Sequence, residues 1–128
     1  MAGPERAENI SPVGWLLENG MKFSIHSDAP VTFPNSMRIF DSAVNRTTRT
    51  GYVLGPKHRL QPLEALKAMT LWSAYQHFEE STKGSIEVGK VADLVILSDN
   101  PLTIERAKLI DIKVVETIKQ GKSIYKAQ

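Results

Sequence analysis

The chain has 128 residues, of which 41% are apolar, and 16 Lys and Arg against 14 Asp and Glu leave a net charge of +2. This length suits one domain with a core, whereas a closed eight-fold α/β barrel needs at least about 200 residues. The absence of cysteine excludes disulfides and thiolate metal sites, and no apolar run is long enough to span a membrane. A nucleic-acid-binding surface would need a larger basic stripe. Because residues 1–9 do not resemble a signal peptide, we expect a cytoplasmic protein.

The first 30 residues predict a helix followed closely by a strand. Residues 1–10 are expected to be loosely held, and Ser11-Pro12 suits the start of a helix that ends at Asn19-Gly20. The apolar run at 21–25 predicts a strand, and Asp28 follows its carboxyl end. In barrel enzymes this position carries catalytic groups.

The middle of the chain predicts two helices joined by a long loop. Asn35 or Ser36 is suited to cap a helix whose apolar residues recur at helical spacing up to Val44. Residues 45–60 contain Gly, Pro and Thr and predict a long loop or lid. A helix then begins at Pro62 and reaches about residue 78, with a break expected near Thr70.

The last third of the chain predicts strands. Residues 91–97 form an aliphatic run typical of a buried strand, and 104–108 suit a short helical turn. Residues 112–119 and 122–125 predict a hairpin around Gln120-Gly121. We place a boundary near Ser81, with α/β structure at 1–81 and β-rich structure at 82–128.

Four segments carry a family resemblance: residues 10–15 read ISPVGW, residues 26–31 read HSDAPV, residues 63–66 read LEAL, and residues 83–97 read KGSIEVGKVADLVIL. Together they resemble the C-terminal portion of the metal-dependent amidohydrolases. The group they most resemble is amidohydrolase family 3, which includes proteins labelled exoenzyme regulatory protein. The resemblance covers nearly the whole chain.

The resemblance implies a mixed α/β fold (α+β as an isolated fragment). Residues 1–81 would supply the last strand and flanking helices of an incomplete (β/α)₈ barrel, and 82–128 the C-terminal half of a small β-sandwich. Asp28 matches the family's eighth-strand Asp, which implies a metal ligand and the catalytic base. The cofactor implied for the complete enzyme is a divalent metal, zinc or similar.

The chain also departs from the family pattern. The family's His-x-His pair is absent, and His26, His58 and His77 match none of its ligand positions. We therefore expect a C-terminal segment of a hydrolase of carbon–nitrogen bonds other than peptide bonds, inactive and metal-free by itself because catalytic zinc sites use three protein ligands. The alternative is a non-catalytic regulatory or protein-interaction domain. The expected partner is the missing N-terminal barrel segment, or a second copy bound through exposed apolar surface.

Several residues have plainer expected roles. His26 either pairs with Asp28 as a weak two-ligand site or is a packed or half-exposed histidine. His58 and the arginines of residues 46–49 are expected in solvent, and His77 in a packed position. Asp93 is expected to be a buried, hydrogen-bonded carboxylate, and Gly84 and Gly89 to serve tight turns.

Overall fold

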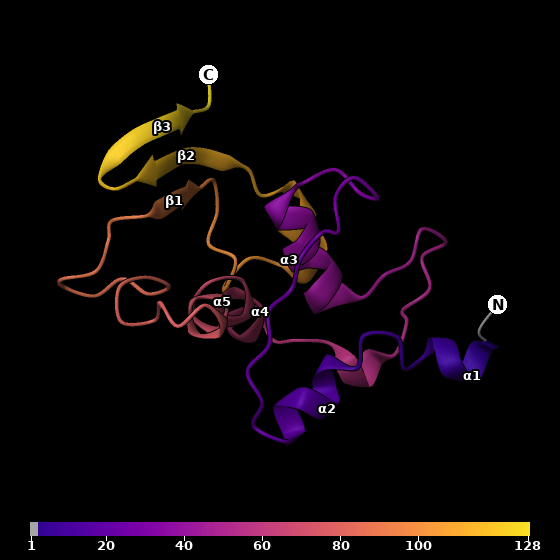
Figure 1. The fold of residues 1–128 in the computed structure, drawn as a ribbon. Coiled ribbons are helices and arrows are strands. Elements are labelled where there is room, and N and C mark those ends of the chain that lie inside the picture. Colours follow the sequence, from indigo (N-terminus) through magenta and orange to yellow (C-terminus); the bar gives the residue numbers. More distant parts are fainter. Residues whose placement is uncertain (1–2) are drawn as a thin grey trace.

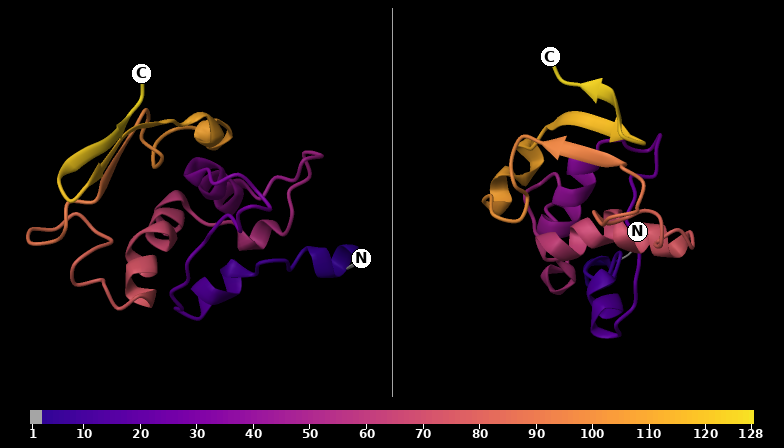
Figure 2. Two further views of the ribbon diagram at one scale, coloured as in Figure 1. Left: turned by 45° about the horizontal axis from the view of Figure 1, so that its top comes forward. Right: turned by 90° about the vertical axis from the view of Figure 1, so that its left-hand side faces the viewer.

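The computed structural model describes residues 3–128 as a mixed α/β structure, which confirms the coarse fold class. Its helices lie towards one side and a three-stranded antiparallel sheet lies at the other, with α1 farthest from the sheet (Figures 1 and 2). In chain order the elements are α1 (Pro4–Ala7), α2 (Val13–Glu18), α3 (Ser36–Asn45), η1 (Pro56–His58), α4 (Pro62–Met69), α5 (Leu71–Gln76), β1 (Leu94–Leu97), η2 (Arg106–Asp111), β2 (Val114–Lys119) and β3 (Lys122–Lys126).

The predicted helix α3 is confirmed together with its cap. The Asn35 side chain accepts a hydrogen bond from the Arg38 N–H at 3.0 Å, which satisfies one of the free donors of the first turn. Helix α2 also forms, but it starts one residue later than predicted, with Pro12 at the N-cap. It ends at Asn19, before Gly20 in the left-handed region.

The predicted strand at 21–25 is not a strand in the structure. No strand pairs with this segment among the described residues, and a strand is defined by such pairing. The segment still directs Phe23 into the core, where it meets Trp72 edge-on at 5.2 Å between ring centroids. The strand assignment is therefore wrong for this structure, and of the apolar run only Phe23 is buried, while Met21 is exposed.

The predicted break near Thr70 separates α4 from α5. Thr70 has φ −127° and ψ −86°, and its hydroxyl donates to the Leu66 carbonyl at 2.8 Å. At the other end of α4, the Gln61 N–H donates to the Glu64 carboxylate at 2.7 Å, and Pro62 occupies the first turn. Local sequence signals thus set both ends of this helix.

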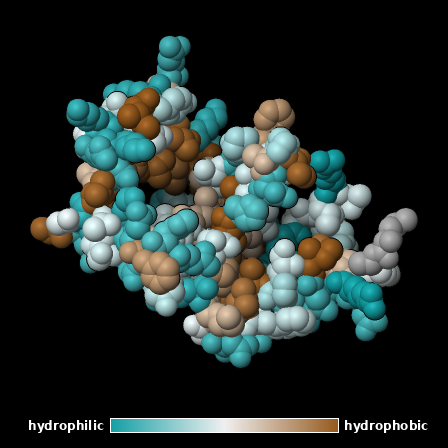
Figure 3. All heavy atoms as spheres, in the orientation of Figure 1, coloured by the Kyte–Doolittle hydropathy of each residue, from teal (hydrophilic) through white to brown (hydrophobic). Residues whose placement is uncertain are grey.

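The sheet has the order β1-β2-β3, and the hairpin of β2 and β3 is confirmed. The prediction of a buried strand at 91–97 is wrong: β1 is shorter, and Val95 and Ile96 are 54% and 45% exposed. The cause is the absence of a second layer, since no described helix packs against the strands. Hydrophobic spheres accordingly appear on the surface over the sheet in Figure 3.

The core gathers residues from widely separated parts of the chain. Phe40 and Val44 of α3 pack with Leu60 and with Leu109 and Ile112 near η2, and all five are almost fully buried. Helix α3 lies against both α4 and η2. This packing fixes the position of α3, which forms one wall of the candidate site. The boundary proposed near Ser81 stays a prediction.

Candidate functional site

Asp28 lies on a sharply turned segment between Ile25 and α3. It has φ 50°, which is uncommon for a residue with a side chain, and it is exposed. Its N–H donates to Nδ1 of His26 at 3.1 Å, and its carbonyl accepts from the Val31 N–H at 2.9 Å. The Thr32 hydroxyl closes the turn by donating to the Ser27 carbonyl at 2.5 Å. The backbone around the Asp28 carboxylate is therefore held while the carboxylate itself stays open to solvent.

The donor atoms near Asp28 do not form a complete metal site. Within residues 3–128, no group of three or more His, Cys, Asp or Glu side chains is placed to hold an ion. Asp28 and His26 offer two side chains, whereas a catalytic zinc uses three protein ligands and keeps one position open. The residues present do not fit a resident metal by themselves, and Asp28 as a ligand and catalytic group stays a prediction.

A cleft of about 270 Å³ opens next to this turn. Residues 25–27 form one side, and the exposed face of α3 forms another. Polar and charged groups enter it from His26, Ser27, Asn35, Arg38 and Ser42, with Arg46 beyond the end of the helix. Ser11 adds a further hydroxyl, and the rest of the lining is apolar, contributed by Val13, Ile25, Phe33, Ile39, Ala43 and Leu60. Asp28 itself is not among the lining residues.

Arg46 was expected in solvent, but its guanidinium is half-buried and bonded to three backbone carbonyls. Nε donates to Leu54 at 2.6 Å, and the two terminal nitrogens donate to Ile10 at 2.6 Å and Ser11 at 3.2 Å. Burial lowers the pKa of Arg46, and the nearby Glu8 carboxylate opposes that shift. The contacts also hold residues 10–11 in place, so the expectation of a loose lead-in is wrong there.

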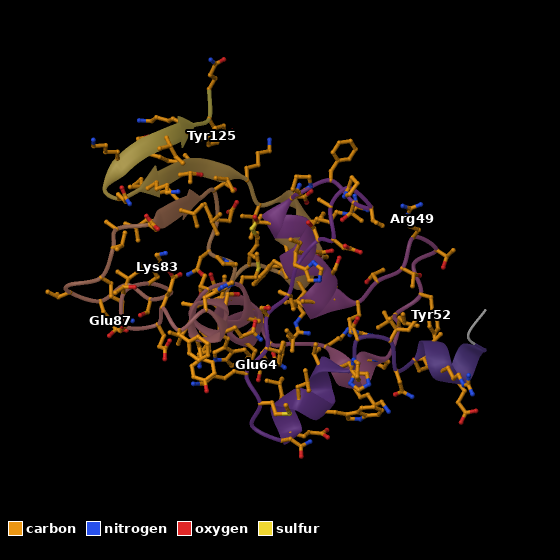
Figure 4. The ribbon with its side chains drawn as sticks, in the orientation of Figure 1. Arg49, Tyr52, Glu64, Lys83, Glu87 and Tyr125 are labelled. Carbon is orange, nitrogen blue, oxygen red and sulfur yellow. The ribbon has the colours of Figure 1, made fainter. Side chains whose placement is uncertain are left out.

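Glu8 adds a second tie between the N-terminal region and the loop after α3. Its carboxylate accepts from the Tyr52 hydroxyl at 2.5 Å and from the Gly55 N–H at 2.7 Å. These hydrogen bonds lower the pKa of Glu8 and raise that of Tyr52. Figure 4 shows Tyr52 on the loop beside α1, and Arg49 on the same loop with its side chain away from the ribbon. Arg49 is exposed, as predicted.

His58 contradicts the expectation of a solvated histidine, because the structure buries it completely. Its ring meets Trp15 edge-on at 5.2 Å, and Nε2 lies 3.3 Å from the Asn9 side-chain oxygen. Nδ1 has no hydrogen-bond partner among the described atoms. Burial lowers the pKa of His58, as do the charges of Arg46 and Lys57. This histidine is a structural group of the core rather than a ligand in the cleft.

The other singled-out residues divide between confirmed and wrong predictions. His77 is exposed rather than packed. Asp93 is exposed rather than buried, but its predicted hydrogen-bonding role is confirmed, since it accepts from the Gln120 N–H at 2.8 Å. Gly84 and Gly89 occupy turns with φ 87° and 91°, as predicted. Of the two alternatives for His26, the structure shows an exposed ring bonded to the Asp28 N–H.

The fold is mixed α/β, and it places a carboxylate on a turn shortly before α3. The sequence model of the Amidohydrolase family matches residues 1–125, and the chain belongs to that family, with family 3 as its group. No helix in the described part is long and apolar enough to cross a membrane.

Three individual comparisons agree with this assignment. The chain is 32% identical to the N-substituted formamide deformylase of Arthrobacter pascens over 88% of the chain and 21% of that protein. It is 34% identical to Protein LONG AFTER FAR-RED 3 of Arabidopsis thaliana over 96% of the chain and 21% of that protein. An amidohydrolase structure from Thermotoga maritima MSB8 matches with a TM-score of 0.68 at 22% identity, over 91% of this chain and 26% of that one. This likeness supports the fold alone. The chain spans about a fifth of the length of these curated relatives.

Proposed function

We propose that this chain supplies the C-terminal part of a metal-dependent hydrolase of carbon–nitrogen bonds other than peptide bonds. The family match over residues 1–125 supports the class, and the name of the Arthrobacter relative supports an amide-like bond. Residues 1–81 would end an incomplete (β/α)₈ barrel, and residues 82–128 would form half of a β-sandwich. The observation that carries this proposal is the segment before Asp28, which has no strand partner among residues 3–128 and with which strands from another segment would pair.

Within this proposal Asp28 is the one carboxylate that the chain contributes to an ion site. The turn that holds its backbone leaves the carboxylate in solvent, where ligands from another segment can reach the same ion. With two donor side chains at hand, the chain alone is inactive. Asp28 is proposed as a ligand of the ion and as the catalytic base, and no further step is assigned to it.

The first test measures metal content and hydrolysis of the purified 128-residue chain after incubation with zinc, manganese or ferrous iron. We expect substoichiometric metal and no turnover of an N-substituted formamide. One tightly bound ion per chain, or turnover that survives gel filtration, would contradict the proposal that the site is incomplete.

The second test places Asp28 in a complete barrel. The matched stretch of the Arthrobacter deformylase is replaced by this chain, and metal content and hydrolysis are measured on the same samples. Asp28→Asn should lower kcat/KM by about 100-fold or more, which is the lower range for loss of a positioned acid–base group. Asp99→Asn, an exposed carboxylate before a turn, is the matched control. Equal activity of the two variants would show that Asp28 has no role in the catalytic site.

The apolar sheet favours a second candidate function, a non-catalytic interaction domain. Ile124 and Tyr125 on β3 are 62% and 52% exposed, and the exposed residues of β1 lie across β2 from them. Tyr125 lies on the outer strand of the sheet (Figure 4). Such a surface promotes association. Sedimentation at increasing protein concentration tests this candidate. Self-association that Ile124→Lys abolishes would support it. A monomer that does not bind ANS, a dye for exposed apolar surface, would count against it.

A further inference from the structure

The cleft beside α3 has charge of one sign. Its lining contains two guanidinium groups, an imidazole and three serine hydroxyls, and none of the lining residues is Asp or Glu. Across residues 3–128, neither Arg38 nor Arg46 forms an ion pair with a carboxylate. Clefts lined by one sign of charge concentrate ligands of the opposite sign.

Arg46 adds positive charge to the cleft, although its guanidinium already donates to three neutral carbonyls. The Glu8 carboxylate offsets part of this charge, but it is not among the lining residues of the cleft. Arg46 therefore attracts an anion mainly through its charge. Arg38 is exposed on the same face of α3, and its side chain makes no hydrogen bond within the described structure, so its fork of donors is available.

The rest of the lining restricts the ligand further. Ile25, Phe33 and Ile39 supply apolar surface in the same cleft. A dry cavity of about 150 Å³ accommodates benzene, so about 270 Å³ accommodates one ring together with a carboxylate. We propose that this cleft binds a small organic acid, with the carboxylate on Arg38 and Arg46 and an apolar body against the Ile25 side. The inference stands without the hydrolase proposed above, since it requires no metal and no reaction.

The test is amide-resolved NMR titration of the intact chain with sodium benzoate. We expect saturable shifts that centre on Ser27, Ile39 and Ser42, with a dissociation constant in the millimolar range because Arg38 is screened by water. Arg38→Gln should weaken binding about tenfold, the scale of one lost charge-assisted hydrogen bond. Arg49→Gln is the matched control, an exposed arginine three residues past Arg46 and outside the cleft.

A second variant adds charge instead of removing it. Ser42 is exposed on α3, so Ser42→Asp should fold normally and should weaken benzoate about tenfold while leaving benzamide unchanged. The same spectra report folding of each variant. Because hydrolysis is not measured, failure here leaves the proposal for Asp28 standing.

Four outcomes would overturn the inference. They are an absence of saturation by benzoate, equal weakening by the Arg38 and Arg49 variants, benzamide bound as tightly as benzoate, and inorganic phosphate bound more tightly than benzoate. The last outcome would identify a phosphate site rather than a carboxylate site.

Discussion

The burial of His58 predicts a specific dependence of stability on pH. Above its ordinary pKa of about 6.5 the imidazole is neutral in both the folded and the unfolded chain, and it contributes no pH dependence. As the pH falls below that value, the unfolded chain takes up a proton that the folded chain resists, because burial, Arg46 and Lys57 all lower the pKa of His58. Glu18 acts in the opposite direction. The free energy of unfolding therefore decreases with acidification until the pH reaches the folded-state pKa, below which this loss stops.

The size of the effect follows from proton linkage. If the folded chain excluded the proton completely, an unfolded-state pKa of about 6.5 would give a loss of about 1.4 kcal/mol between pH 7.5 and 5.5, which is the upper limit of the effect. Carboxylates contribute little in this window, since their ordinary pKa values lie near 4. Burial, not the single contact with Asn9 at 3.3 Å, sets the magnitude.

Urea unfolding at several pH values measures the effect, with His58→Gln as the reference because glutamine does not titrate. The wild-type free energy of unfolding should fall more steeply with acid than that of the variant, by up to about 1.4 kcal/mol across the window. The comparison is between the slopes of the free energy of unfolding against pH for the two proteins. A destabilisation by the substitution that is the same at every pH does not change these slopes. Parallel pH profiles for the two proteins would refute the reasoning.

Three further predictions concern single substitutions. Gly14→Ala should destabilise the chain by about 1–3 kcal/mol in chemical denaturation, despite the better helix propensity of alanine. The reason is that a Cβ there would lie 2.6 Å from the Lys57 carbonyl oxygen and 2.8 Å from the His58 ring. Gly3→Ala, where the Cβ has open space, is the control and should show little change. Phe40→Ala should cost about 3–5 kcal/mol in the same assay, since Phe40 is 1% exposed, and a loss under 1 kcal/mol would mean that the core collapses around it. Asp28→Asn should change the unfolding free energy by less than about 0.5 kcal/mol, because the side chain is exposed; a large loss would assign it a structural role.

The elements that the sequence predicted well are those fixed by neighbouring residues. The Asn35 cap, the Gln61–Glu64 box with Pro62, and the turn at Gln120-Gly121 each act within a few positions, so pattern alone locates α3, α4 and the hairpin. The strand at 21–25 failed for the opposite reason. Its apolar residues are genuine, but a strand requires a partner, and no described segment pairs with this one.

The site shows the same division. The motif around Asp28 is local and was recognised, but the strand predicted to precede it does not form. The cleft was not predicted, because it depends on Arg46 reaching Ile10, which lies 36 positions earlier, and on α3 lying against residues 25–27. Likewise His58 lies in a basic, polar segment, and only the approach of Gly14 and Trp15 buries it. No spacing rule encodes such contacts.

The three carbonyls on Arg46 have a practical consequence for anyone who trims this chain for crystallisation. Cutting just before Pro12 would remove Ile10 and Ser11 and leave the guanidinium with Leu54 alone. The same cut would remove Glu8, to which Tyr52 and Gly55 are tied. The stretch from 47 to 55 would then lose its contacts with the N-terminal region, and digestion there would be the first sign that a start site had been chosen too late.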